Sequence, residues 1–106
     1  VKGFKRLINN DFKYEVQYTS QFKKNFKKVL RQGKDEKKFI DVLEKIANGE
    51  KLDLKYRNHS LMDDKLYKGC YECHINPDWL LVYRIVQDKL ILLLVATGSH
   101  SELFGK

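Results

Sequence analysis

Long apolar stretches are missing from the sequence, and the longest, residues 90–96, has only the length of a strand. A helix needs about 20 mostly apolar residues to span a bilayer, so we expect no membrane association. The first ten residues also lack the apolar core of a signal peptide. We therefore expect a cytoplasmic protein, in which Cys70 and Cys73 stay reduced.

Repeats, low-complexity runs and flexible linkers are absent as well, and the 106 residues include one proline and six glycines. A chain of this size, with 42% hydrophobic residues, is typical of a single domain with one core. We assign that domain to residues 14–106. Residues 1–13 are basic and weakly patterned, and we interpret them as an N-terminal extension outside the core.

Acidic residues are scarce relative to basic ones: 14 Asp and Glu stand against 21 Lys and Arg, for a formal net charge of +7. Such an excess favours polyanionic partners, with nucleic acid ahead of an anionic membrane surface. An acidic protein partner is a third interpretation, and a basic surface that only keeps the protein soluble is a fourth.

Apolar residues alternate with polar ones at residues 14–18, which predicts a half-buried strand. Two stretches of helical spacing follow, one after a cap at Thr19 or Ser20 and one after a cap at Asp35. We expect these helices to form an antiparallel pair, because only a short break around Gly33 separates them.

Three further strands are expected at residues 66–74, 79–86 and 89–96, after a long polar loop at residues 50–65. They should form an antiparallel meander with the helix pair on one face. The predicted fold class is therefore α+β, in the order β-α-α-β-β-β, with a small, mainly antiparallel sheet packed on a helical hairpin.

The segment from Cys70 to His74 matches C-x-x-C-H, the attachment pattern of c-type haem, and its cysteines and histidine also fit part of a zinc site. Side chains alternate along a strand, so Cys70 and Cys73 should lie on opposite faces of the sheet. We therefore predict neither a metal nor another cofactor. A zinc site that borrows His59 or His100 is the alternative.

Three histidines lie outside the predicted helices: His59 in the polar loop, His74 at a strand end and His100 after the last strand. The meander should bring His74, Asp78 and His100 towards one edge, with His59 supplied by the loop. Two imidazoles suit RNA cleavage, because one can take the proton of a 2′-hydroxyl and the other can protonate the leaving oxygen. For any one histidine, an ordinary surface role is about as consistent with the sequence.

Aromatic and cationic side chains supply candidates for RNA binding. Trp79, the only tryptophan, either packs in the core or stacks on a base, and Phe104 has the same two interpretations. Arg84 is a candidate phosphate-binding group from its strand position. The lysines of the first helix, at residues 23–28, most often mean a solvated face, and can also dock on a phosphate backbone.

Three blocks of sequence carry recognisable patterns. Residues 56–61 are similar to a D-H-x-L loop, residues 67–83 contain H-x-x-P-D-W-[IL]-L-[IV]-Y, and residues 97–105 contain G-[ST]-H-x-x-L-F. In this order they resemble the YafQ branch of the RelE superfamily of bacterial type II toxins. The resemblance extends over about residues 14–106.

The resemblance implies a RelE-like fold and the toxin of a type II toxin–antitoxin system. Such a toxin is a ribosome-dependent mRNA endoribonuclease that needs no metal and uses 2′-hydroxyl transesterification. The implied partners are a cognate DinJ- or RelB-like antitoxin, the ribosome and its mRNA, with operator DNA bound only through the antitoxin complex. The resemblance assigns catalysis to His59, His74, Asp78 and His100, and implies that Trp79 and Phe104 contact or shape the RNA site.

The sequence departs from the family pattern at three places. Asn58 stands where an aspartate usually precedes the loop histidine, residues 62–65 lengthen the link to the next strand, and residues 1–13 have no counterpart. Two other functions stay open: a non-catalytic nucleic-acid-binding module of the same fold, and a Cys/His metal-binding protein. A cleavage assay separates the first from the toxin, and metal analysis separates the second.

Overall fold

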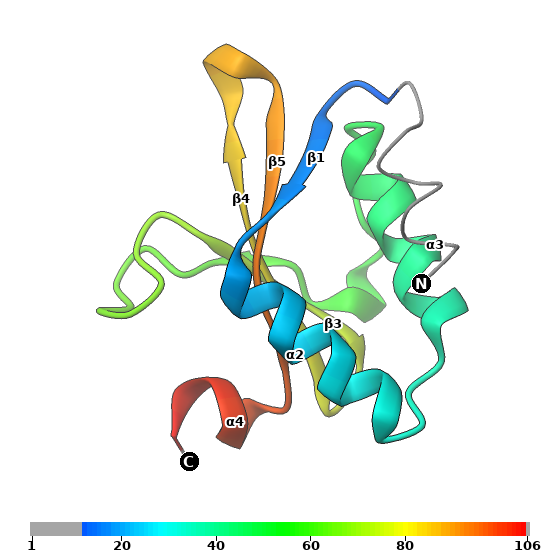
Figure 1. The fold of residues 1–106 in the computed structure, drawn as a ribbon. Coiled ribbons are helices and arrows are strands. Elements are labelled where there is room, and N and C mark those ends of the chain that lie inside the picture. Colours follow the sequence, from blue (N-terminus) through cyan, green and yellow to red (C-terminus); the bar gives the residue numbers. More distant parts are fainter. Residues whose placement is uncertain (1–11, 106) are drawn as a thin grey trace.

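The computed structural model describes residues 12–105, which form one layer of sheet with helices on it (Figure 1). Most of the predicted N-terminal extension, residues 1–11, lies outside the described residues; Phe12 is partly buried against the core. The elements are β1 (Glu15–Tyr18), α2 (Ser20–Arg31), α3 (Glu36–Ala47), β2 (His59–Ser60), β3 (Tyr71–Asn76), β4 (Trp79–Val86), β5 (Ile91–Gly98) and α4 (His100–Phe104), with short 3-10 helices at Leu54–Tyr56 and Gln87–Lys89.

The five strands form one sheet in the order β1-β5-β4-β3-β2. β3, β4 and β5 make the predicted antiparallel meander, and β1 pairs with β5 in parallel. The predicted fold class, α+β with a mainly antiparallel sheet, is confirmed. β2 was not predicted: it is a two-residue strand within the expected polar loop, and it pairs with the outer side of β3.

The bounds of two predicted strands are wrong. β3 begins at Tyr71 instead of residue 66, because residues 66–70 form a folded loop in which Leu66 is exposed while Tyr67 and Cys70 are buried. In that loop the Asp64 carboxylate accepts from the backbone N–H groups of Leu66 and Tyr67, and Tyr67 turns inward to 5% exposure. β5 runs from Ile91 to Gly98 instead of from residue 89 to residue 96, and the 3-10 helix Gln87–Lys89 joins it to β4.

Capping residues place both long helices where the sequence predicts them. The Thr19 hydroxyl accepts from the Phe22 N–H at 3.0 Å, and the Asp35 carboxylate accepts from the Lys37 N–H at 3.0 Å. Each cap satisfies a backbone donor at the start of a helix that has no carbonyl partner within it. The helices therefore begin at defined residues and present their apolar faces to the sheet.

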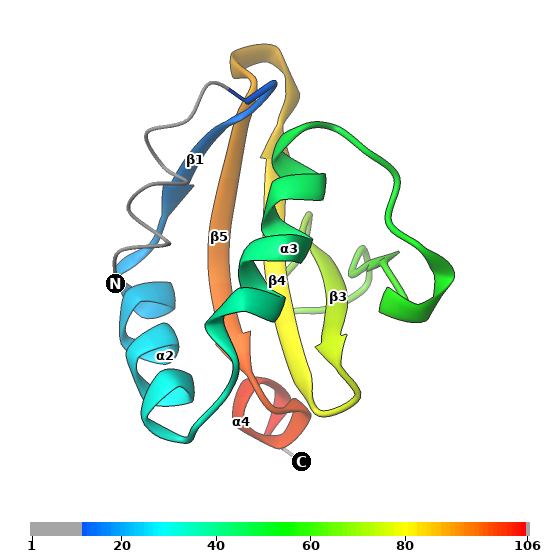
Figure 2. The same cartoon turned by 90° about the vertical axis from the view of Figure 1, so that its right-hand side faces the viewer.

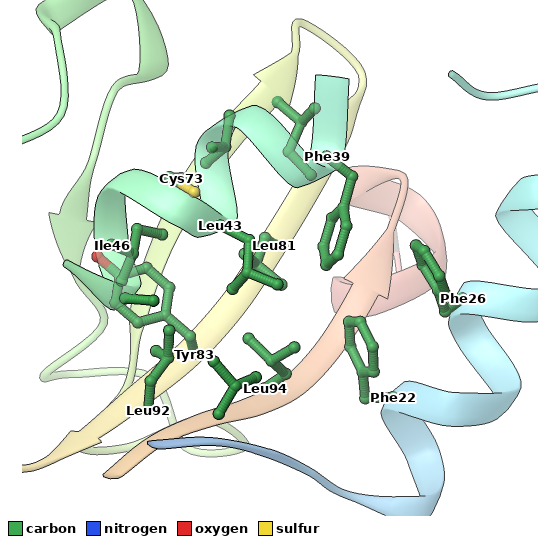
Figure 3. Close-up of a cluster of buried hydrophobic side chains, with 14 of the residues drawn as sticks. Phe22, Phe26, Phe39, Leu43, Ile46, Cys73, Leu81, Tyr83, Leu92 and Leu94 are labelled. Atoms are coloured by element: carbon green, nitrogen blue, oxygen red, sulfur yellow. The ribbon is translucent and has the colours of Figure 1, made fainter. Parts of the chain in front are cut away.

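The main core lies between the helix pair and one face of the sheet, and Figure 2 looks onto that face with α3 in front. Phe22 and Phe26 of α2 meet Phe39 of α3 at ring-centroid distances of 5.8 and 4.7 Å, and Figure 3 shows these rings with the strand side chains beneath them. Complete burial of a side chain such as Phe22 or Phe39 stabilises the fold by about 1.5–3 kcal/mol. These contacts hold the helical hairpin on the sheet.

The opposite face of the sheet carries a second, smaller cluster under α4 and the loop before β3. Its buried members are Tyr67, Cys70, Leu80, Val82, Ala96 and Leu103. Along β3 this face is not closed by a helix, and polar side chains point from it. Within residues 12–105, no helix is both long enough and apolar enough to cross a bilayer.

Candidate active site

Two histidines and a glutamate meet at the outer edge of the sheet. The Nε2 atoms of His59 and His74 lie 3.4 and 3.5 Å from the same oxygen, Oε1 of Glu72. The strand register explains the meeting: His59 of β2 stands opposite Glu72 of β3, and His74 lies two residues further along the same face. The Glu72 side chain is 6% exposed, whereas that of His59 is 51% exposed. The carboxylate is thus the buried centre of the group.

The other ring nitrogens are held by backbone carbonyls. Nδ1 of His59 lies 2.8 Å from the Arg57 oxygen, and Nδ1 of His74 lies 3.3 Å from the Pro77 oxygen. A carbonyl only accepts, so in both contacts Nδ1 is the donor. A neutral ring held in this way presents an unprotonated Nε2, and a hydrogen bond to Glu72 then requires a second proton on that ring. Two rings therefore compete for one carboxylate oxygen, an arrangement suited to proton transfer.

Asn58 does not orient the neighbouring histidine. Its side-chain oxygen accepts a 2.7 Å hydrogen bond from the Tyr83 hydroxyl of β4, whereas the Arg57 carbonyl orients His59. Arg57 itself has a positive φ of 48°, which turns the chain sharply just before β2. The departure from the family aspartate therefore leaves His59 with a partner, and Asn58 fastens the loop to the sheet.

Asp78 and His100 lie at the same end of the sheet as His74, as Figure 2 shows for the β3–β4 turn and α4. His74 stands opposite Leu80, and Leu80 stands opposite Gly98, two residues before His100. Two strand spacings of about 4.8 Å separate His74 from Gly98, roughly 10 Å in all. The structure thus gathers His59 and His74 directly, and places the exposed Asp78 and His100 nearby without bringing them into contact with that pair.

α4 is fixed by its own caps and by an ion pair. The Ser99 hydroxyl and the Glu102 carboxylate form a reciprocal capping box, and Glu102 Oε2 lies 2.8 Å from Lys28 Nζ of α2. The hydrogen bond from Lys28, followed by that from the Ser99 N–H, lowers the pKa of Glu102 to about 2. His100 packs on Phe104 with ring centroids 5.0 Å apart, so these two candidates are held as one unit.

Trp79 is a core residue. It is fully buried, it stacks near Phe39 at 6.3 Å, and its indole N–H donates to the Thr97 hydroxyl at 2.9 Å. The first residue of β4 faces the helices because Leu80 after it faces the second cluster. The prediction that Trp79 contacts RNA is therefore corrected: its ring has no exposed face for a base, and it supports the site from inside.

Arg84 and Phe104 occupy different places relative to the histidines. Arg84 is exposed on β4, four residues along the strand from Leu80, or roughly 13 Å at the rise of a strand. It lies near Cys70, where its charge opposes the burial that raises the pKa of that thiol. Phe104 is partly buried, with its ring edge-on to Tyr67 at 5.5 Å. Only Phe104, through His100, belongs to the end of the sheet where the histidines lie.

The cysteines lie on opposite faces, as predicted. Cys73 is in the main core and Cys70 is in the second cluster. Burial raises the pKa of the Cys73 thiol to about 12, with the neighbouring Glu72 carboxylate adding to the effect. Among residues 12–105, no three or more His, Cys, Asp or Glu side chains are arranged to hold a metal ion.

Glu72 is the residue that sequence reasoning missed. Its signal was present: Glu72 and His74 are two apart on a strand, so both must share the face opposite Cys73. The pairing with His59 was not accessible, because it depends on β2, a strand of only two residues. The centre of the candidate site is thus a carboxylate between two imidazoles, not a histidine alone.

A small, mainly antiparallel sheet covered by two helices is the fold of RelE-like toxins, and solved structures of YafQ toxins match this chain. A family model described as "Bacterial toxin of type II toxin-antitoxin system, YafQ" matches residues 14–105. The chain therefore belongs to the YafQ toxin family, and the resemblance carried by its three sequence blocks is confirmed.

Individual relatives agree with this assignment. The mRNA interferase toxin YafQ of Escherichia coli strain B / BL21-DE3 is 34% identical over 92 residues, covering 86% of this chain and 96% of that protein. A chain in the crystal structure of the E. coli DinJ-YafQ toxin-antitoxin complex matches with a TM-score of 0.78 and 28% identity, over 89% of this chain and 100% of that one. The crystal structure of a metal-bound toxin from Helicobacter pylori matches with a TM-score of 0.77 and 38% identity, over 84% and 97%.

Proposed function

We propose that this toxin is a ribosome-dependent mRNA endoribonuclease that acts in the cytoplasm and is neutralised by a DinJ- or RelB-like antitoxin. The observation that carries the proposal is the position of Glu72 Oε1 within 3.5 Å of Nε2 of both His59 and His74. The relatives named mRNA interferase, and the DinJ-YafQ complex, support the substrate and the kind of partner.

In the proposed reaction, one imidazole takes the proton of the ribose 2′-hydroxyl while the 2′-oxygen attacks phosphorus. The bond from phosphorus to the 5′-oxygen breaks, and the second imidazole donates its proton to that oxygen. The products are a 2′,3′-cyclic phosphate, or its opened form, and a 5′-hydroxyl. Since both Nε2 atoms lie within 3.5 Å of one oxygen, they are no more than about 7 Å apart, close enough to serve one phosphodiester.

The remaining candidates have supporting roles in this proposal. His100 and Asp78 lie at the same sheet end and can assist proton transfer or orient the substrate. Phe104 holds the His100 ring and can contact a base, and Arg84 can offset phosphate charge from further along β4. Trp79 contributes by packing under the start of β4.

The test is primer extension on mRNA in a reconstituted translation system, with and without the purified toxin. Wild-type protein should introduce cuts within translated codons, His59→Ala and His74→Ala should each abolish them, and a cognate antitoxin should suppress them. Binding of nucleic acid by the wild-type protein without any cut on translating ribosomes would overturn the proposal in favour of a binding module.

The proposal includes a metal-independent reaction, which needs its own assay because ribosomes require magnesium. The toxin is stripped with a chelator, its transition-metal content is measured by mass spectrometry, and it is then added to intact ribosomes. Cleavage at an undiminished rate is expected. Loss of cleavage after chelation, with recovery on addition of copper or zinc, would contradict metal independence. It would indicate that this toxin binds metal, as the H. pylori toxin in the metal-bound crystal structure does.

A further inference from the structure

A groove of about 530 Å³ opens beside the candidate active site, between α3, the 3-10 helix Leu54–Tyr56 and the end of β3. This volume falls in the range of roughly 300–1,000 Å³ typical of ligand pockets, so the groove has room for a nucleotide and not only for an ion. The residues that line it are Lys38, Asp41, Lys55, Tyr56, Arg57, His74, Ile75, Asn76 and Pro77.

The groove shares a residue with the catalytic group. His74 lines it and also directs Nε2 at Glu72. Arg57, which also lines the groove, supplies the carbonyl that orients His59. An RNA strand that brings a phosphodiester to His59 and His74 can therefore reach this groove around the edge of β3, because the groove lies on the side of the sheet that α3 covers.

The charges of the lining suit a phosphate backbone. Lys38, Lys55 and Arg57 contribute three cations, and none of them is ion-paired with a carboxylate among residues 12–105. Lys38 instead donates from Nζ to the side-chain oxygen of Asn76, another lining residue, at 3.3 Å. Cations without a protein counter-charge are free to bind phosphate oxygens, and doing so releases counterions from the RNA.

One carboxylate in the lining distinguishes RNA from other polyanions. Asp41 repels a phosphate but can accept a hydrogen bond from a ribose 2′-hydroxyl, which DNA lacks. Tyr56 adds a ring that Lys55 covers at 5.1 Å and Lys45 covers at 5.5 Å, so its neighbourhood is also positive. Every nucleotide of RNA carries a 2′-hydroxyl that can donate to Asp41, whereas the Asp and Glu side chains of an acidic peptide carry no such donor.

We propose that this basic groove, formed around Lys38, Lys55 and Arg57, binds the sugar-phosphate backbone of the mRNA next to the bond that is cut. The inference rests on the proposed function and extends it, because it assigns a binding subsite beyond the catalytic side chains. It also assigns this contact with the RNA backbone to the groove beside α3, and not to the lysine-rich outer face of α2.

The experiment compares two charge-matched double variants of the full chain. Lys38→Gln/Lys55→Gln removes two groove cations, and Lys23→Gln/Lys27→Gln removes two exposed lysines from α2. Binding of a single-stranded 12-nucleotide RNA is measured by fluorescence anisotropy over a series of salt concentrations. Thermal unfolding of each variant verifies that it is folded.

The groove variant should lower the magnitude of the slope of log K against log salt concentration by about 1.4, since each lost phosphate contact on a single strand removes about 0.7. The α2 variant should leave the slope within error of the wild type. Equal changes in the two variants, a larger change in the α2 variant, or wild-type protein that does not bind the RNA at low salt would each overturn the proposal.

Two further readouts separate this proposal from the others. An oligo-glutamate peptide whose binding, unlike that of RNA, depends on the groove lysines would overturn the proposal in favour of an acidic protein segment. Suppose that the salt dependence of RNA binding falls in the groove variant, but the wild-type protein cuts no mRNA on ribosomes. The proposed function would then be refuted, and the groove assignment would stand. If the wild-type protein cuts mRNA on ribosomes but the groove variant keeps the wild-type salt slope, the groove assignment would be refuted and the proposed function would stand.

Discussion

The Tyr83 hydroxyl donates a 2.7 Å hydrogen bond to the Asn58 side chain, and this bond joins the central strand β4 to the loop that carries His59. Tyr83 is 5% exposed and its ring stacks on Tyr71 at 5.8 Å, so its position is fixed by packing. Burial raises the pKa of Tyr83 above its usual range, so the hydroxyl remains a neutral donor at any pH used for assays. The sheet thereby positions the catalytic loop through this hydrogen bond as well as through the pairing of β2 with β3.

Tyr83→Phe should therefore reduce cleavage while keeping the fold. The phenyl ring retains the packing, and loss of one partly buried hydrogen bond costs about 1 kcal/mol of the free energy of unfolding. Cleavage in the translation assay should fall several-fold, because the loop no longer holds His59 against Glu72. Tyr71→Phe, which removes a hydroxyl from the neighbouring exposed ring, is the matched control. Equal activities for the two variants would show that Asn58 does not position the loop.

Glu72→Gln should impair catalysis more than it impairs stability. The amide has nearly the same shape, but it removes the negative charge that either imidazolium can bind. We expect cleavage to fall by at least about tenfold, part of the 10²–10⁴-fold that positioned acid–base groups contribute. The pH profile of the rate should change shape, because proton sharing between His59 and His74 loses its common acceptor. A uniformly reduced rate with an unchanged profile would point to a structural role alone.

Local signals explain the parts of this structure that the sequence predicted. Thr19 and Asp35 act within three residues of themselves, so a helix start can be read from them directly. The meander was equally accessible, because adjacent strands pair in order. The sequence could not decide the roles of Glu72 and Trp79, because one depends on the pairing between β2 and β3 and the other on which face of β4 the helices cover.

Trp79 as a core residue makes a prediction that its fluorescence can test, because it is the only tryptophan of the chain. A fully buried indole should emit at short wavelength and resist quenching by acrylamide, and saturating RNA should leave its emission unchanged. Trp79→Phe should lower the free energy of unfolding by about 1–3 kcal/mol, since it leaves the Thr97 hydroxyl without its indole donor and opens a cavity. Emission quenched by RNA in the wild-type protein would restore the stacking interpretation.

The ion pair between Lys28 and Glu102 predicts how stability depends on pH. The folded-state pKa of Glu102, about 2, is below the ordinary value of 4.5. The carboxylate therefore stabilises the fold above about pH 4.5, and this contribution is lost as the pH falls towards 2. Because the Glu102 side chain is 30% exposed and that of Lys28 is 55% exposed, screening should limit the effect to about 1 kcal/mol.

Glu102→Gln tests this dependence cleanly, because glutamine can still accept from the Ser99 N–H and keep the capping box while the charge is lost. Urea unfolding at pH 7, 4 and 2.5 should show the variant less stable than the wild type at pH 7, with a difference that shrinks as the pH falls and is small at pH 2.5. High salt at pH 7 should reduce the difference. A difference as large at pH 2.5 as at pH 7 would assign the effect to packing of α4 and not to the ion pair, since most of the charge-dependent stabilisation is lost between pH 4.5 and pH 2.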